Sequence, residues 1–152
     1  MQISLALNLP RDAATIPVAR HIARDALREV GVTDECSMAI EVALTEAATN
    51  VVKHSGPGDA YEVGMTLSGD HCTIRVVDTG RGFDFSSLAG LASDLSAERG
   101  RGMELMHALV DQVTFESKPE AGTIVHLEKQ LQLLDASPLQ RFGVGMNDGL
   151  SR

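Results

Sequence analysis

Aromatic residues and basic residues are both scarce in this chain of 152 residues. Aromatic side chains make up 3% of the residues and tryptophan is absent, which argues against a stacking platform for single-stranded nucleic acid. The 13 lysines and arginines are outnumbered by 21 acidic residues, giving a formal net charge of -8. This balance disfavours a nucleic-acid binder, because phosphate backbones require clustered cations. It still permits a nucleotide, which needs only one local site.

Disulfide pairs and long apolar runs are also missing. Cys36 and Cys72 are the only cysteines, too few for a disulfide framework and suited to a reducing compartment. No segment approaches the roughly 18 consecutive apolar residues of a membrane helix. The start of the chain has no basic segment ahead of a long apolar core. We therefore expect a soluble, cytoplasmic protein that makes no membrane contact.

The hydrophobic residues that are present, 43% of the chain, predict one globular domain, since a domain takes roughly 150 residues. Strict alternation of apolar residues predicts strands, and spacings of three or four predict amphipathic helices. The predicted elements are a strand over 2–9, helices over 12–30 and 34–54, strands over 60–67 and 71–78, a helix over 102–111, and strands over 112–117 and 122–131.

This order predicts an α+β fold, a two-layer sandwich in which helices cover one face of a mixed, mostly antiparallel sheet. Most connections between neighbouring strands are too short for parallel crossovers. Residues 79–102 contain five glycines and predict a long functional loop. We expect the domain to span residues 1–134, and residues 135–152, poor in periodic apolar positions, to form a flexible tail.

A carboxylate and an amide lie one turn apart on the second predicted helix. Glu46 and Asn50 share one helical face and could hold a proton acceptor and a metal-binding oxygen at a fixed separation. Such pairs on helices are more often solvated surface. Lys53 and His54, in the next turn, either contact a phosphate or complement the helix C-terminus as cations do.

The predicted strand over 71–78 ends in an acidic residue followed by glycines. Gly80 and Gly82 let the backbone approach a ligand closely, and Asp78 beside them suits the exocyclic amine of a purine. The alternative is an ordinary Asp-Thr-Gly turn without a ligand.

A third motif opens the predicted helix over 102–111. The N–H groups around Gly100, Gly102 and Met103 would form an anion site at the helix start. Arg99 and Arg101 either reach phosphate oxygens or remain solvated.

The order of these motifs resembles the ATP-binding domain of the GHKL superfamily, which includes gyrase, Hsp90, histidine kinases and MutL. E-x-x-x-N is followed about 28 residues later by D-x-G-x-G and about 18 residues further by G-x-G. Gly122 and Thr123 match the threonine that the family carries on the adenine side. Within the superfamily, EVALTEAATNVVKHS, VVDTGRGFD, RGRGMELMHALVDQVTFES and GTIVHLEKQL are similar to bacterial anti-sigma-factor serine/threonine kinases. The resemblance covers about residues 3–131 and implies a Bergerat-type fold.

The resemblance implies roles for the motif residues, with ATP and Mg²⁺ as cofactors. Asn50 would coordinate Mg²⁺, and Glu46 would deprotonate the attacking hydroxyl. Asp78 would accept a hydrogen bond from the adenine amino group, supported by Thr123. Gly80 and Gly82 would let the backbone run close to the adenine base. The N–H groups at Gly100 and Gly102 would bind the phosphates, and residues 84–99 would form a lid.

The same resemblance implies ATP-dependent phosphorylation of a serine or threonine on a STAS-type antagonist, together with sequestration of a sigma factor. A homodimer is compatible with it. Arg20 falls where the family carries a partner-contacting arginine, although a solvated arginine is an equal alternative.

Three other functions remain to be weighed. A sensor histidine kinase would need a helical hairpin with a phosphoacceptor histidine ahead of Glu46, and His21 is followed by Ile22 rather than by an acidic residue. A non-catalytic ATP-binding module is a second alternative, but a pure nucleotide holder gains nothing from a carboxylate near the γ-phosphate. Simple ATP hydrolysis is the third.

Overall fold

The computed structural model describes residues 1–54, 60–78, 104–118 and 122–142. The strands are β1 (Gln2–Pro10), β2 (Ala60–Ser68), β3 (His71–Asp78), β4 (Gln112–Lys118) and β5 (Gly122–Gln130). The helices are the 3-10 turn η1 (Ala13–Thr15), α1 (Ile16–Glu29), α2 (Asp34–His54) and α5 (Pro138–Phe142). Residues 104–109 are also helical.

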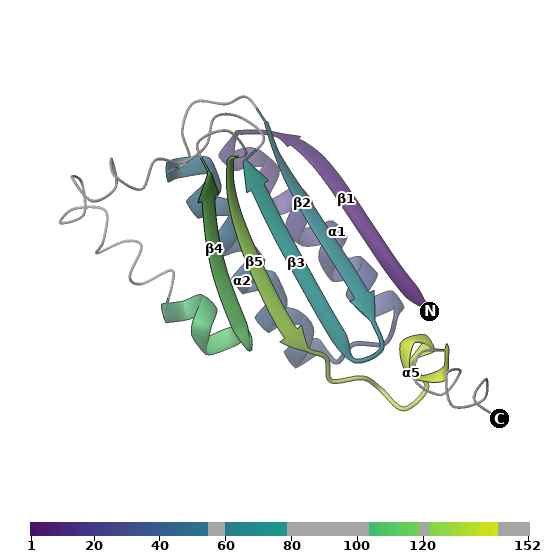
Figure 1. Ribbon diagram of the computed structural model, residues 1–152. Helices are drawn as coiled ribbons and strands as arrows, with labels where there is room; N and C mark the ends of the chain where they lie inside the picture. Colours follow the sequence, from purple (N-terminus) through teal and green to yellow (C-terminus); the bar gives the residue numbers. More distant parts are fainter. Residues whose placement is uncertain (55–59, 79–103, 119–121, 143–152) are drawn as a thin grey trace.

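The five strands form one sheet in the order β1-β2-β3-β5-β4, and helices α1 and α2 cover one of its faces (Figure 1). The predicted α+β two-layer fold with helices on one face is confirmed. All four neighbouring strand pairs are antiparallel, so the described sheet holds no parallel pair and is not mixed. The α1–α2 hairpin follows β1 and returns the chain beside it, so that β2 pairs antiparallel with β1.

The hydrophobic core lies between the helices and the sheet. Alternate residues of β1 are less exposed than their neighbours, and the inward positions are the leucines and isoleucine that the alternation predicted. Helix α2 places small residues such as Ala43 and Ala47, both 0% exposed, against the sheet. Both cysteines, Cys36 and Cys72, are buried in this core as free thiols.

The start and end of α1 follow from local chemistry. The Asp12 side chain accepts a hydrogen bond from the backbone N–H of Ala14, at 2.8 Å, and so caps the turn that leads into the helix. Gly31 ends the hairpin turn after α1 with a φ of 81°, which glycine adopts without strain. A Cβ atom at Gly31 would also lie 3.0 Å from the Cα of Ser137, so the position is closed to larger residues.

The segment after β5 differs from the prediction. Residues 137–142 were expected to belong to a flexible tail, but Ser137 and Leu139 are 1% and 0% exposed, and α5 follows the segment that bridges to Val32. The prediction missed this packing because one buried leucine and one serine are too few to produce a periodic pattern. Residues 143–152 lie outside the described residues.

Among the helices that the structure describes, none is long and apolar enough to cross a membrane.

Candidate functional site

One end of the domain gathers the ends of three elements that carry predicted site residues. Strand β3 ends at Asp78, β5 begins at Gly122, and α2 ends at His54; all three termini lie at the upper end of the sheet in Figure 1. Helix α2 contacts both β3 and β5. The fold therefore brings residues that are far apart in sequence to one edge of the core.

Asp78 and Thr123 lie side by side at this end. The last paired residues of β3 and β5 are Val77 and Ile124, and the register continues by one step to Asp78 and Thr123. Alternation turns both toward the helices, since Val76 and Val125 are buried on the same face. Asp78 is 0% exposed and Thr123 is 6% exposed. The Asp78 carboxylate and the Thr123 hydroxyl are thus both buried on the face of the sheet that the helices cover.

Asn50 is the buried polar residue of α2 at this end, with 9% of its surface exposed. The helix satisfies its threonine hydroxyls internally: Thr45 donates to the Glu41 carbonyl at 2.8 Å, and Thr49 donates to the Thr45 carbonyl at 2.7 Å. Asn50 Nδ2 has no hydrogen-bond partner in the described part of the chain. Glu46, one turn earlier, is half-buried.

These buried polar atoms fit a ligand site. The Thr123 hydroxyl, like Asn50 Nδ2, lacks a hydrogen-bond partner among residues 1–54, 60–78, 104–118 and 122–142. Buried polar groups in folded proteins are nearly always bonded, so each such group calls for a partner outside this set. The described residues contain no group of three or more His, Cys, Asp or Glu that could hold a metal by themselves. A single amide oxygen fits Mg²⁺, which usually takes one or two protein ligands together with water and phosphate oxygens.

A tyrosine that the sequence analysis did not single out supports this end of the sheet. Tyr61 is the Cα partner of Asp78 across β2 and β3, and it is 0% exposed. Its hydroxyl forms a 2.8 Å hydrogen bond with the Thr15 hydroxyl. Burial raises the pKa of Tyr61, and the bond to Thr15 lowers it by less. The available signal was composition, because Tyr61 is the only tyrosine in the chain.

The remaining predicted residues divide into described and undescribed ones. Lys53 is exposed at the end of α2, His54 is the last residue of that helix, and Arg20 is half-buried on α1. Asn50, Asp78 and Thr123 are the predicted residues that the fold buries together. Outside the described residues lie Gly80, Gly82, Arg99, Gly100, Arg101, Gly102, Met103 and the proposed lid over 84–99.

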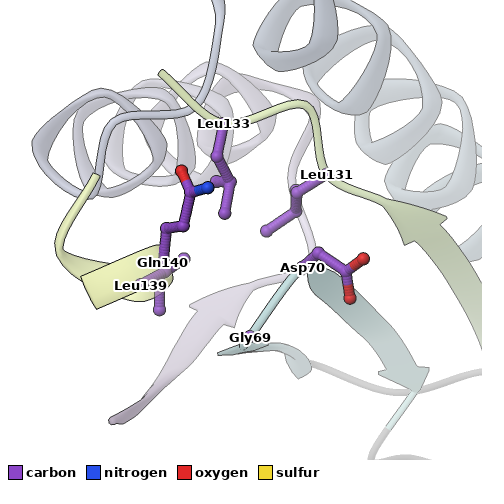
Figure 2. A pocket seen from close by; sticks show the side chains of 6 residues that line it. All are labelled: Gly69, Asp70, Leu131, Leu133, Leu139 and Gln140. Carbon is purple, nitrogen blue, oxygen red and sulfur yellow. The ribbon is translucent and has the colours of Figure 1, made fainter. Parts of the chain in front are cut away.

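A separate cavity of about 340 Å³ lies at the opposite end of the sheet. The turn between β2 and β3 and the segment after β5 line it, with Leu131 and Leu133 pointing inward and the Asp70 carboxylate turned away (Figure 2). Among the predicted site residues that the structure describes, none lines this cavity.

Comparisons with known proteins agree with the fold. Residues 9–129 match the family of the histidine kinase-like ATPase domain. An anti-sigma F factor from Thermoanaerobacter sp. (strain X514) is 32% identical over 101 residues, covering 60% of this chain and 68% of that protein. A serine-protein kinase RsbW from Bacillus cereus (strain Q1) is 26% identical over 136 residues, covering 83% and 84%.

Solved structures with low sequence identity share the fold. The RsbU and RsbW domains of a Mycobacterium tuberculosis protein superpose with a TM-score of 0.66 at 22% identity, covering 85% of this chain and 32% of that one. The histidine kinase domain of a blue-light activated kinase from Erythrobacter litoralis gives 0.51 at 19% identity, covering 81% and 62%. The chain belongs to the histidine kinase-like ATPase domain family, and it is related to anti-sigma factors and RsbW serine kinases.

Proposed function

We propose that this protein is an ATP-dependent protein serine/threonine kinase of the anti-sigma-factor type. In this proposal it uses Mg-ATP to phosphorylate a STAS-type antagonist protein, and it sequesters a sigma factor. The observation that carries the proposal is the burial of Asn50, Asp78 and Thr123 at one end of the sheet, with Glu46 one helical turn away. Membership of the ATPase domain family and the relation to RsbW serine kinases support the same activity.

Asp78 and Thr123 would bind the adenine. An ionised carboxylate accepts hydrogen bonds only, so Asp78 suits the exocyclic amino group, and the neighbouring Thr123 hydroxyl can donate or accept. A site built to bond a polar group rejects analogues that lack it, because its buried groups are then left unpaired. The pair would therefore select adenine over a base with a carbonyl at that position.

Asn50 and Glu46 would serve the phosphate end of the site. The Asn50 side-chain oxygen would hold Mg²⁺, which when bound neutralises charge on the phosphate oxygens. Glu46 would accept the proton of a serine or threonine hydroxyl as the hydroxyl oxygen bonds to the γ-phosphorus and the bond to the ADP oxygen breaks. Phosphoryl transfer consists mainly of positioning and charge stabilisation, so a small set of residues is sufficient.

The partner surface would include α1. Arg20 lies on this helix and is half-buried. An arginine at an interface can bond a carboxylate in a bidentate way, which suits an acidic side chain on the bound protein. The name of the related anti-sigma F factor supports a sigma factor as partner, and the STAS-type substrate follows the motif resemblance described in the sequence analysis.

The test measures transfer of labelled phosphate from ATP to a purified STAS-type protein, together with Mg-ATP affinity by calorimetry. We expect labelled partner with the wild type and a loss of about 10²-fold or more in rate with Glu46→Gln, because a general base contributes about that much. Affinity for Mg-ATP should survive in the variant. Glu35→Gln, an exposed change at the other end of α2, is the matched control and should transfer phosphate at the wild-type rate.

The outcomes separate the candidate functions. Label that persists in Glu46→Gln contradicts the role of Glu46. Binding of Mg-ATP without label in any variant overturns the kinase assignment and favours a non-catalytic ATP-binding module. Release of phosphate into solution at the same rate with and without the partner would indicate simple ATP hydrolysis.

A further inference from the structure

The connection between β1 and α1 contacts both sides of the candidate nucleotide site. It comprises residues 10–15, here called the 10–15 turn, and it enters the helix that carries Arg20. One side of the site is the last turn of α2, with Asn50. The other side is the edge of the sheet, with Asp78. Neither the motifs nor the family resemblance assigns a role to this turn.

Arg11 joins the turn to α2. Its Nε and Nη2 groups both donate to the Val52 carbonyl, each at 3.4 Å, across 41 positions in sequence. Val52 lies among the last four residues of α2, whose carbonyls have no partner within the helix. The guanidinium therefore caps the end of the helix from a distant segment, and its positive charge complements the negative end of the helix dipole. Asn50 lies two residues before the carbonyl that Arg11 binds.

Thr15 joins the same turn to the sheet. Its hydroxyl lies 2.7 Å from the Asp12 carbonyl, 3.0 Å from the Pro10 carbonyl and 2.8 Å from the Tyr61 hydroxyl. Since the Thr15 hydroxyl has one proton, the Tyr61 hydroxyl can donate to it while Thr15 donates to a carbonyl of the turn. The Tyr61 ring is fully buried beside Asp78, its cross-strand partner. This bond fixes the side chain that packs next to the adenine-side carboxylate.

We propose that Arg11 and Tyr61 are positioning residues of the nucleotide site, holding the α2 side and the sheet side at the separation that Mg-ATP requires. The inference rests on the proposed function, because it assumes that the nucleotide binds between these two sides. Neither residue needs to touch the nucleotide. Arg11 acts through the backbone of α2, and Tyr61 acts through Asp78.

The experiment measures the dissociation constant of Mg-ATP by calorimetry on the full chain. We expect Arg11→Ala to raise it about tenfold, or about 1.4 kcal/mol, because the end of α2 is then no longer held in the geometry that binds the nucleotide. Arg11→Lys should recover part of the loss, since an ammonium group can still donate to the Val52 carbonyl. Tyr61→Phe, which keeps the ring and removes the bond to Thr15, should raise the constant about threefold.

Two matched controls test whether removing any arginine, or any hydroxyl that pairs with another hydroxyl, weakens Mg-ATP binding in the same way. Arg28→Ala removes an arginine of α1 that is 58% exposed and lies 3.9 Å from Asp34. Thr66→Val removes a hydroxyl of β2 that lies 3.4 Å from the Ser4 hydroxyl, on an exposed part of the same strand as Tyr61. Both controls should bind Mg-ATP within about twofold of the wild type, as surface changes usually do.

Recovery by the conservative variant distinguishes positioning from general stability. Thermal midpoints without nucleotide report the loss of the helix cap itself, so the quantity to compare is the shift that Mg-ATP adds in each variant, which should be smaller for Arg11→Ala than for Arg11→Lys. If Arg11→Ala does not fold, Tyr61→Phe decides. Wild-type affinity in Tyr61→Phe, and in Arg11→Ala where it folds, overturns the inference. A wild-type chain that binds no Mg-ATP overturns the proposed function instead, so the two failures are distinguishable.

Discussion

At the end of the sheet where β3 stops, Asn50 and Thr123 bury polar atoms that have no partner within the described residues. At the opposite end, the segment after β5 bonds its polar groups to the rest of the domain. The Thr33 N–H donates to the Gln132 carbonyl and the Leu134 N–H donates to the Gly31 carbonyl. Both ends belong to one sheet and one core, yet within the described residues their buried polar groups are bonded to different extents.

This difference in hydrogen bonding predicts that one end of the sheet serves ligand binding and the other end serves stability. An unsatisfied buried group costs free energy, so each such group at the β3 end needs a partner from outside the described residues, which the proposed nucleotide would supply. The opposite end, formed by the segment after β5 and here called the satisfied end, has apolar side chains such as Leu131 and Leu139. Their burial contributes to the free energy of unfolding. Substitutions at the two ends should therefore have different effects on nucleotide affinity and on unfolding.

The largest effect on stability is expected at the satisfied end. Leu139→Ala removes a side chain that is 0% exposed and should lower the free energy of unfolding by about 2–5 kcal/mol. The affinity of the folded variant for Mg-ATP should not change. Chemical denaturation and calorimetry measure the two quantities. Leu134→Ala, at a position that is 55% exposed, is the control and should lose far less stability. A folded variant with weakened nucleotide binding would show that the two ends are coupled.

For Asp78→Asn we expect a large loss of Mg-ATP affinity and a smaller change in the free energy of unfolding. Loss of the carboxylate charge and of one of its two acceptor oxygens should raise the dissociation constant of Mg-ATP about 100-fold, or about 2.7 kcal/mol, and reduce stabilisation by the nucleotide by a similar free energy. The thermal midpoint measured with and without Mg-ATP reports this change. Asp70→Asn, at the opposite end of β3, is the matched control and should keep the stabilisation. An Asp78→Asn variant that the nucleotide stabilises as much as the wild type would contradict the assigned role.

A pH effect is expected from the core near the satisfied end. Burial raises the pKa of the Cys72 thiol to about 12, and the nearby Cys36 adds to the rise. The native thiol keeps its proton where an unfolded thiol, with an ordinary value near 9, loses it. Below about pH 9 the thiol is protonated in both states and the free energy of unfolding is at its full value. As the pH rises from 9 toward 12, the unfolded thiol ionises while the native thiol does not, so the free energy of unfolding falls.

The loss should follow a slope of about 1.4 kcal/mol per pH unit, measured by urea denaturation between pH 8 and pH 11. Other groups also titrate in this range, so the quantity to compare is the difference between the wild type and Cys72→Ala. That difference should shrink as the pH rises. A difference that stays constant would mean that the native thiol ionises as readily as an unfolded one.

The smallest effect concerns one buried hydroxyl. Ser137 donates to the Val30 carbonyl and accepts the Leu139 N–H at 3.2 Å, which closes the segment after β5 onto the α1–α2 hairpin. Ser137→Ala should lower the free energy of unfolding by about 1 kcal/mol. Ser4→Ala, which removes an exposed hydroxyl pair, should change it by less than about 0.5 kcal/mol. Equal losses in the two variants would contradict the structural role of Ser137.

The sequence predicted the regular elements well because their apolar residues are periodic. The inward residues of β1 and the buried face of α2 follow the spacings of a strand and a helix, and both elements formed within one residue of their predicted bounds. The packing of α5 was missed because it depends on contacts between Ser137, Gly31 and Val30, more than 100 residues apart in the chain. Local patterns carry no information on such contacts.

The site was predicted less completely than the fold. Motif order identified Asn50, Asp78 and Thr123, which the fold buries at one end. Arg11 and Tyr61 could not be identified in this way, because their importance depends on a backbone carbonyl and on strand register, and neither is visible in a motif. The structure shows the burial of Asn50, Asp78 and Thr123, while the binding and catalytic roles of all the motif residues stay predictions.

The helices that the structure describes between residues 16 and 54 cover one face of the sheet, and this asymmetry should appear in mutational tolerance. Along β1 and β2, inward positions such as Leu5 and Met65 are packed, while Ser4 and Thr66 point to the face opposite these helices. Saturation mutagenesis should therefore produce a two-residue rhythm of intolerant and permissive positions along these strands. The permissive positions offer places where labels, charges or affinity handles can be attached without disturbing the rest of the domain.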